Sequence, residues 1–355
     1  KMSEPVDIKI AHINKNESIN NALNKEAVFE IFSRSSFEAI APFYKFQQAW
    51  TNRAYETFKD FDTYLILMYL KQKIYVDYSD RFHYMSADAF YSQEKIAIDK
   101  INLIQISKSL NIPKETVRRK INYLQEHEII FRSGKSIYLN SKALEIIKPN
   151  NSLPKLAIFF EKMSEILSKE DWFGKSLKRE NIEQFIKDHF TVCWEYFYRF
   201  QIPYLTRHRK AFGDLESWNV WGSIAIVQVS TYTKSLVEIT REELSTYEDF
   251  YMSMLKFKCE RGINASSIAD ISGIPRATVI RKLRTLEKKG FIRRNKKLEY
   301  TLGQSKNLKT FQTNYLINQK NLSDFCTTLF NLTIGVFPIA SRAFNAFIIL
   351  LLGSL

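Results

Sequence analysis

Glycine and proline are scarce in this chain of 355 residues, with 10 and 8 copies respectively. A turn-rich β architecture needs more of both, so their scarcity favours a mainly helical fold. Cysteine is scarce as well, and Cys193, Cys259 and Cys326 lie far apart and form no CxxC pair. We therefore expect no disulfide framework, and three isolated cysteines fit a protein of the reducing cytoplasm.

Long apolar runs are missing at both ends of the chain. The first 18 residues contain no apolar signal region. Near the C-terminus, Pro338, Arg342 and Asn345 interrupt an otherwise apolar segment, and the uninterrupted run AFIILLL has only seven residues. A membrane-spanning helix needs about 20. We expect a buried or dimerising helix here rather than a membrane anchor.

Patterns that carry catalysis are also absent. The chain has no GxxxxGKS, GxSxG, HExxH or glycine-rich dinucleotide loop. Its five histidines show no metal-ligand spacing with the cysteines. We expect no catalytic residues, no metal site and no cofactor, and hence a protein that is not an enzyme.

Charge is one-sided. The chain has 52 Lys and Arg against 38 Asp and Glu, a net charge of +14, and a sequence pI of about 9.4. This balance favours a polyanionic partner, either nucleic acid or an anionic membrane surface. A genome rich in A and T, which enriches Lys, Asn and Ile, produces the same composition. Composition alone does not distinguish a polyanionic partner from the bias of such a genome.

One pattern of 22 residues occurs twice. Residues 273–294 read GIPRATVIRKLRTLEKKGFIRR and residues 111–132 read NIPKETVRRKINYLQEHEIIFR, with identity at 9 of 22 positions. PFYKFQ at 42–47 precedes the first copy and YFYRFQ at 196–201 precedes the second, with an apolar helical run in between each time. The same order of parts predicts an internal repeat of about 110 residues.

The second copy predicts a helix-turn-helix followed by a basic β-hairpin. Residues 273–275 form the turn, and a helix follows from about Arg276 to Lys289, where Gly290 ends it. The outward face of such a helix fits the DNA major groove, which is about 12 Å wide. Ten basic residues and one acid give +9 between 276 and 297. The predicted DNA contacts are Arg276, Thr278, Arg281, Lys282, Arg284, Arg293, Arg294, Lys296 and Lys297.

These contacts divide by chemistry. Arg281 and Arg284 are expected to bind guanine in bidentate fashion. Thr278 is expected to bind phosphate at the helix N-terminus. The basic residues of the hairpin are expected to bind phosphate as well.

The first copy predicts the same geometry with weaker charge. Six basic residues and three acids give +3 between 114 and 135. Arg119 aligns with Arg281, and both are expected on the outward face. The predicted contacts are Lys114, Thr116, Arg118, Arg119, Asn122, Arg132 and Lys135. A degenerate copy that packs or dimerises is the alternative.

The predicted fold class is mainly α, of the α+β winged-helix type, with two duplicated winged helix-turn-helix domains joined and flanked by extra helices. The aromatic residues of the two FQ motifs, Trp218 and Trp221 are expected in the core rather than around an effector pocket. The predicted divisions are an N-terminal arm (1–39), winged-helix repeat one (40–150), a bridging helical segment (151–189), winged-helix repeat two (190–303) and a helical tail (304–355) that is a candidate for dimerisation.

The pattern at 273–294 resembles the recognition helix and wing of bacterial winged-helix transcription regulators of the MarR-like and IclR-like kinds. The resemblance covers about 40 residues per repeat and implies binding of double-stranded DNA by the second helix and the wing. Such regulators usually carry one motif per chain and dimerise. Two motifs in one chain depart from that pattern.

We therefore expect a cytoplasmic transcription regulator that binds specific double-stranded DNA. A plasmid-type replication initiator that binds iterated sites is one alternative, and a winged-helix scaffold for protein contacts is another. A homodimer through the C-terminal helices remains open, and a small-molecule effector remains unspecified. No membrane partner is expected.

Overall fold

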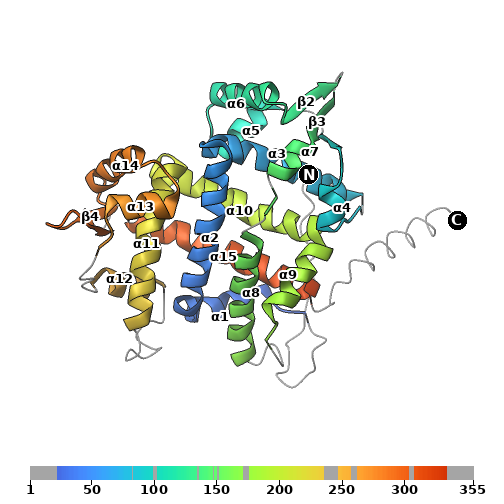
Figure 1. Cartoon of the computed structure of the whole chain (residues 1–355). Coiled ribbons are helices and arrows are strands. Elements are labelled where there is room, and N and C mark those ends of the chain that lie inside the picture. Colours follow the sequence, from blue (N-terminus) through green and yellow to red (C-terminus); the bar gives the residue numbers. More distant parts are fainter. Residues whose placement is uncertain are drawn as a thin grey trace.

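The computed structural model describes residues 22–81, 83–98, 102–133, 136–146, 148–149, 152–170, 176–235, 247–256, 262–303 and 308–333. These residues form a mostly helical protein with two small antiparallel sheets (Figure 1). The predicted fold class, mainly α with winged-helix character, is confirmed.

The amino-terminal elements are α1 (Lys25–Arg34), α2 (Ser36–Phe58), α3 (Phe61–Asp80), α4 (Ala87–Tyr91), β1 (Lys95–Ile98), α5 (Leu103–Leu110), α6 (Lys114–Glu126), β2 (Ile130–Ser133), β3 (Ser136–Asn140), α7 (Ser141–Ile146) and α8 (Ser152–Lys169). The carboxy-terminal elements are α9 (Arg179–Asp188), α10 (Phe190–Phe212), α11 (Leu215–Ser235), α12 (Tyr247–Lys256), α13 (Ala265–Ser272), α14 (Arg276–Lys288), β4 (Ile292–Arg294), β5 (Tyr300–Leu302) and α15 (Leu308–Thr333).

Two sets of these elements have the same layout. We call α5, α6, β2 and β3 the first winged unit, and α13, α14, β4 and β5 the second winged unit. In the first, β3 lies between β1 and β2, with Ile98 opposite Ile137. In the second, β5 pairs with β4, and an isolated bridge joins Tyr300 to Ile263 in the place that β1 takes in the first.

The long helices interlock at the centre of the molecule. Helix α3 packs on α10, and α11 packs on α2 (Figure 1). The ring centroids of Phe43 and Phe200 are 6.2 Å apart, and those of Phe46 and Phe197 are 5.8 Å apart. These four residues belong to the two FQ motifs, and each motif contributes the same two positions to the contact. The contact between α2 and α10 is therefore reciprocal.

The glutamines that end the two motifs lie in this contact. Gln47 and Gln201 are buried and exchange two hydrogen bonds of 2.9 Å, each side-chain amide donating to the carbonyl oxygen of the other. Each side-chain nitrogen and each side-chain oxygen of the pair thus has a hydrogen-bond partner, as buried amides require. The two residues are separated by 154 positions, and this offset recurs throughout the long helices.

Outer helices close the structure around this centre. Helix α8 packs on α2, α15 packs on α10, and α1 lies against both α15 and α8. The predicted arm at 1–39 therefore includes a packed helix, α1, with Val28, Ile31 and Phe32 buried. Its residues 1–21 and the apolar C-terminal segment from residue 334 lie outside the described residues. No described helix is both long and apolar enough to span a bilayer.

Candidate nucleic-acid interface

Local sequence explains the second winged unit. Helix α13 begins after Asn264, whose side chain accepts a hydrogen bond from the Ser267 amide at 3.0 Å. It ends at Gly273, whose φ of 67° places it in the left-handed region that glycine adopts without strain. Pro275 precedes α14, where its missing N–H leaves no intrahelical bond unmade. The helix is one residue shorter than expected, ending at Lys288.

The first winged unit is built by related signals. The Asn102 side chain caps α5 through the amides of Ile104 and Gln105. Asn111 occupies the left-handed position, with φ at 53°, which asparagine tolerates better than most residues. Pro113 precedes α6. The inner faces are fully buried in both units, formed by Val117, Ile121 and Leu124 on α6 and by Val279, Leu283 and Leu286 on α14.

Most of the predicted contact residues are exposed. On the second unit these are Arg276, Arg281, Arg284, Arg293, Arg294, Lys296 and Lys297, with Thr278 half-buried. On the first unit Lys114, Arg118, Arg119 and Asn122 are exposed and Thr116 is half-buried. Lys135 and the side chain of Arg132 lie outside the described residues.

Lys282 differs from the prediction because it points inward. Its ammonium lies 2.6 Å from the Asp214 carboxylate, and its side chain is 15% exposed. Lys120, at the aligned position of α6, lies 2.8 Å from Asp60. Asp60 and Asp214 precede α3 and α11, where they also accept hydrogen bonds from the amides of Thr63 and Ser217. The same ion pair thus attaches the second helix of each unit to a long helix.

The two ion pairs shift the pKa of Asp60 and the pKa of Asp214 in the same direction. Burial pushes the pKa of Asp60 upward, but hydrogen bonds from Lys120 and Thr63 outweigh it, so that its pKa is lowered. The pKa of Asp214 is lowered for the same reason, by Lys282 and Ser217 against the effect of burial. Both carboxylates are therefore ionised at neutral pH, and both ion pairs are present.

Arginine side chains on the outward faces are either paired or available. Within the described part of the chain, Arg119, Arg281 and Arg284 make no side-chain hydrogen bond or ion pair. In contrast, Arg118 lies 2.6 Å from Glu115, and Arg294 lies 3.5 Å from Glu287. The available guanidinium groups have five donors each, in the planar fork that matches a guanine edge or a phosphate.

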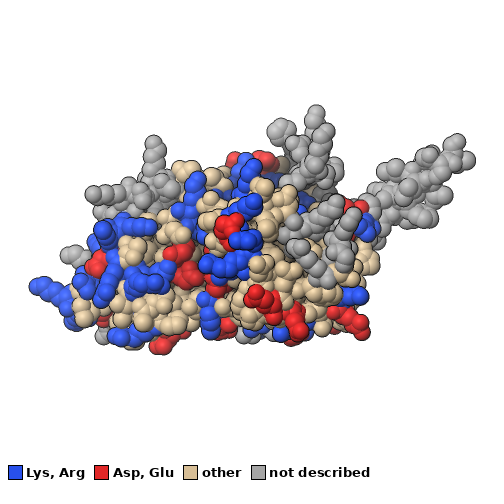
Figure 2. Space-filling view, turned by 90° about the horizontal axis from the view of Figure 1, so that it is seen from above, with Lys and Arg blue, Asp and Glu red and all other residues tan. Residues whose placement is uncertain are grey.

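The wing of the second unit ends in a tight basic turn. The Asn295 side chain accepts from the amides of Lys297 and Glu299, at 3.0 and 2.9 Å. This turn leaves Lys296 and Lys297 exposed at the tip. Figure 2 shows basic side chains gathered over the end of the molecule where α14 and β4 lie in Figure 1. Towards the middle of that face basic and acidic side chains are mixed.

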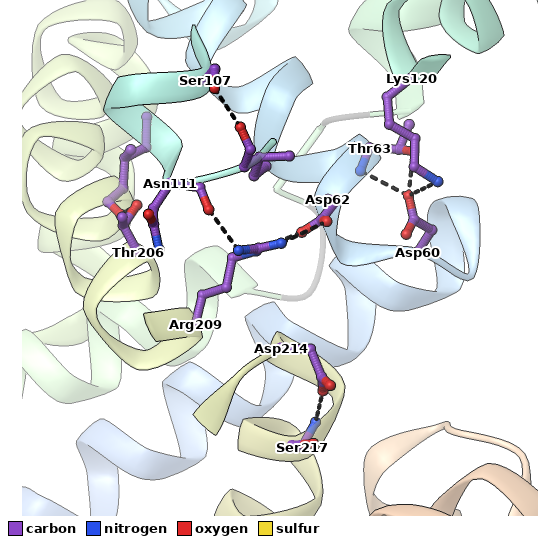
Figure 3. A network of polar contacts seen from close by, with 12 residues as sticks. Asp60, Asp62, Thr63, Ser107, Asn111, Lys120, Thr206, Arg209, Asp214 and Ser217 are labelled. Carbon is purple, nitrogen blue, oxygen red and sulfur yellow. Dashed lines mark hydrogen bonds and ion pairs between the residues drawn. The ribbon is translucent and has the colours of Figure 1, made fainter. Parts of the chain in front are cut away.

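We call the elements from α1 to α8 the first half of the structure and those from α9 to α15 the second half. Arg209, from the second half, contacts the first winged unit. From α10 it lies 2.9 Å from Asp62 at the start of α3, and it donates to the Asn111 carbonyl oxygen at 2.7 Å (Figure 3). Asn111 is the turn residue between α5 and α6. Asn52, on α2, makes the converse connection by donating to the Ile271 carbonyl oxygen of α13 at 2.5 Å. Each winged unit is therefore held by the first long helix of the other half.

Sequence reasoning missed these positioning residues. Asp60, Asp62, Asp214 and Arg209 lie outside the 22-residue pattern and have no motif of their own. Extending the comparison from the two FQ motifs at their own offset of 154 residues would have shown Asp60 and Asp214 at matching positions, each just before an apolar helix. Arg209 has no counterpart at that offset, because Tyr55 occupies the position.

Comparison with known proteins gives one finding. A family model described as the sugar-specific transcriptional regulator TrmB matches residues 241–302, which contain the second winged unit. Searches of curated proteins and of solved structures gave no match. The matched range supports a helix-turn-helix transcription regulator that binds DNA. The likeness to MarR-like and IclR-like regulators and the second motif at 111–132 stay predictions.

The described residues contain no group of three or more His, Cys, Asp or Glu side chains placed to hold a metal ion. Cys193 and Cys326 are buried, and burial raises the pKa of both thiols, which keeps them protonated.

Proposed function

We propose that the protein is a transcription regulator that binds double-stranded DNA through both winged units, arranged as an internal pseudo-dimer. In this proposal α6 and α14 each enter a major groove. Arg119 and Arg281 read base edges, and Lys296 and Lys297 bind phosphates beside the second site. Lys282 takes no part because it is paired with Asp214.

One observation carries the proposal. Arg119 and Arg281 are aligned, exposed and unpaired within the described residues, on helices that the same Asp–Lys ion pair attaches to the core. The reciprocal contact between α2 and α10 adds support, because a homodimer with twofold symmetry makes contacts of this kind. We infer that the chain contains an internal duplication and that the two halves occupy the places of two subunits.

The covalent link between the two winged units determines how such a protein binds DNA. When one unit is bound, the second is held close to the duplex, so its binding becomes intramolecular. If both units engage one face of the duplex, their half-sites lie about one helical turn, or 34 Å, apart. The two half-sites need not be identical, because α6 and α14 present different residues.

Selection of bound sequences from a random duplex pool tests the proposal. Wild-type protein should select two conserved blocks about 10 base pairs apart. Arg119→Ala should lose information in one block and Arg281→Ala in the other. A single block, unaffected by Arg119→Ala, would assign DNA reading to the second unit alone. Failure to enrich any sequence would refute specific DNA binding and favour the protein-contact scaffold.

A plasmid-type replication initiator is the second candidate, because two winged units in one chain depart from the usual single motif of a regulator. The selected sequence separates the candidates. Iterated copies at a replication origin favour an initiator, and isolated copies upstream of genes favour a regulator.

We also propose a homodimer through the C-terminal helices, because two large apolar side chains are exposed there. Leu316 and Ile317 are exposed on α15, at 56% and 42%. Sedimentation of the wild type and of Leu316→Glu at the same concentration tests it, and identical monomer masses would refute it.

A further inference from the structure

A cavity of about 140 Å³ lies between the halves, away from the proposed DNA-binding faces. Helices α1, α2, α8, α10, α11, α12 and α15 all contribute to its wall. Aromatic rings dominate the lining, among them Phe43, Tyr44, Phe159, Tyr204, Trp218 and Trp221. Trp218 and Trp221 are buried, as expected, but they also face this space. An engineered apolar cavity of similar size, about 150 Å³, is known to bind benzene.

Small residues of α11 create this space. Gly222 and Ala225 line the cavity, and a Cβ atom built at Gly222 would have nothing nearer than the Gln48 Oε1 atom, at 3.9 Å. At the same 154-residue offset, α3 carries Met68 and Lys71, both fully buried. The Lys71 side chain lies among five aromatic rings, and its Nζ atom is 2.9 Å from the Tyr91 hydroxyl. The corresponding space in the other half is therefore filled by the chain itself.

The lining contains no Asp, Glu, Lys or Arg side chain. Its polar groups are amides, a histidine, hydroxyls and indole N–H groups, and those without a partner among the described residues include one acceptor of Gln48 and one ring nitrogen of His208. Gln48 donates to Asn52 and Asn219 at 2.7 Å, but its Oε1 atom accepts nothing there. The His208 Nδ1 atom has no partner either.

The hydrogen bonds around His208 define its tautomer. Arg207 donates to the Asn318 Oδ1 atom at 2.7 Å, so the Asn318 amide nitrogen faces the His208 Nε2 atom at 3.3 Å. The Nε2 atom therefore accepts, and the proton resides on Nδ1. Burial, followed by the nearby Arg207 charge, lowers the pKa of His208 to about 3, so the ring is neutral at physiological pH. The unused groups of the lining residues thus include the His208 Nδ1 donor and the Gln48 Oε1 acceptor.

The same wall contacts the second winged unit. Asn219 lines the cavity and donates to the Ser272 carbonyl oxygen at 3.2 Å. Gln48 donates to both Asn219 and Asn52, and Asn52 donates to the Ile271 carbonyl oxygen at 2.5 Å. Ile271 and Ser272 form the last turn of α13, directly before the turn into α14. A molecule that contacts Gln48 and Asn219 would therefore act on the carbonyl groups that end α13.

We propose that this cavity binds an uncharged aromatic small molecule of one or two rings, and that its occupancy is relayed to α13 through Gln48, Asn52 and Asn219. The aromatic walls select ring systems, because buried apolar area dominates binding in such sites. The lack of charged lining residues rejects anions and cations, whose desolvation would go uncompensated. A single hydroxyl or N–H group on the ring satisfies the Gln48 Oε1 atom.

Calorimetry with 2-naphthol and indole as probes tests the binding step. Indole-3-acetate serves as the charged counterpart and maltose as the polar one. Gly222→Met copies the residue of the other half and fills the cavity, whereas Gly222→Ala adds one carbon atom where there is room for it. We expect Gly222→Met to weaken binding of the neutral probes at least tenfold, and Gly222→Ala to have a smaller effect. Circular dichroism and Tm should show both variants folded.

Two kinds of binding result would contradict the proposal. Binding of neither neutral probe to wild type, or equal binding to wild type and a folded Gly222→Met, would overturn the proposal. Maltose or indole-3-acetate binding in preference to the neutral probes would overturn the assigned ligand class.

Hydrogen exchange tests the relay without any DNA. The bound probe should slow exchange of the α13 amides in the wild type at least threefold. Asn52→Ala keeps the cavity lining intact and removes one of the two branches of the relay, while the bond from Asn219 to the Ser272 carbonyl oxygen remains. It should therefore bind the probe normally and show weaker protection of the α13 amides than the wild type. Unchanged α13 exchange in the wild type, with the probe bound, would refute the relay. Because no DNA is present, this result stands whether or not the proposed regulator function is correct.

Discussion

The first winged unit has a net charge of +3 over residues 114–135, and the second has +9 over residues 276–297. Both are attached to the core by the same ion pair, Asp60–Lys120 in one half and Asp214–Lys282 in the other. The interior differs as well, since α3 fills with Lys71 the space that α11 leaves open at Ala225. The positioning contacts are thus alike, while the surfaces and the interior fillings differ.

The difference between the interiors of the two halves should produce the largest effect, which is on the free energy of unfolding. Lys71 is fully buried, and burial holds its pKa well below the ordinary value, so the unfolded chain binds a proton that the folded chain binds weakly. Lys71→Met keeps the volume and removes this penalty. We expect the free energy of unfolding at pH 7 to rise by about 1–4 kcal/mol, the range measured when buried ion pairs are replaced by apolar residues.

The pH dependence supplies a second readout for Lys71. Above the folded-state pKa and below about 10.4, the unfolded state holds more protons, so stability should rise with pH by up to about 1.4 kcal/mol per unit. Urea unfolding of wild type and Lys71→Met between pH 7 and 9 isolates the effect by difference. Lower stability of Lys71→Met at every pH would show that the amine contacts with Tyr91 and the rings are net stabilising.

The surface difference should appear in DNA affinity. Arg281→Ala should cost about 1–3 kcal/mol on the selected site, because a bidentate base contact is lost. Arg119→Ala should cost less, because the first unit has fewer basic neighbours to hold the helix on DNA. Fluorescence anisotropy with specific and random duplexes at one salt concentration measures both. Equal losses on the two duplexes would exclude base reading by Arg281.

The wing should give the smallest effect. Replacing Lys296 and Lys297 by Gln removes two expected phosphate contacts and should lower the slope of log K against log salt by about 0.9 for each. Lys187→Gln on α9, whose lysine is paired with Glu183, is the matched control and should leave the slope unchanged. A slope that falls equally in the control would show a general charge effect rather than a wing contact.

Local patterns were sufficient to place the turns before α6 and α14 and these two helices themselves. Asn111, Gly273 and the prolines that follow them are neighbours in sequence, and the inner faces of α6 and α14 repeat with the helical period. The inward direction of Lys282 was not predictable in this way, because its partner Asp214 is 68 residues away. The cavity depends on side chains from seven helices, and no local pattern brings those together.

The reciprocal pair Gln47–Gln201 has a consequence for the way in which DNA binding depends on protein concentration. An ordinary dimer separates into inactive monomers on dilution, so the concentration of active dimer falls faster than the total protein concentration. Here both partners of the pair belong to one polypeptide, and the contact persists at any copy number. For the proposed regulator acting as a single chain, without the proposed homodimer, occupancy of a site would follow the number of molecules in proportion, down to a few per cell.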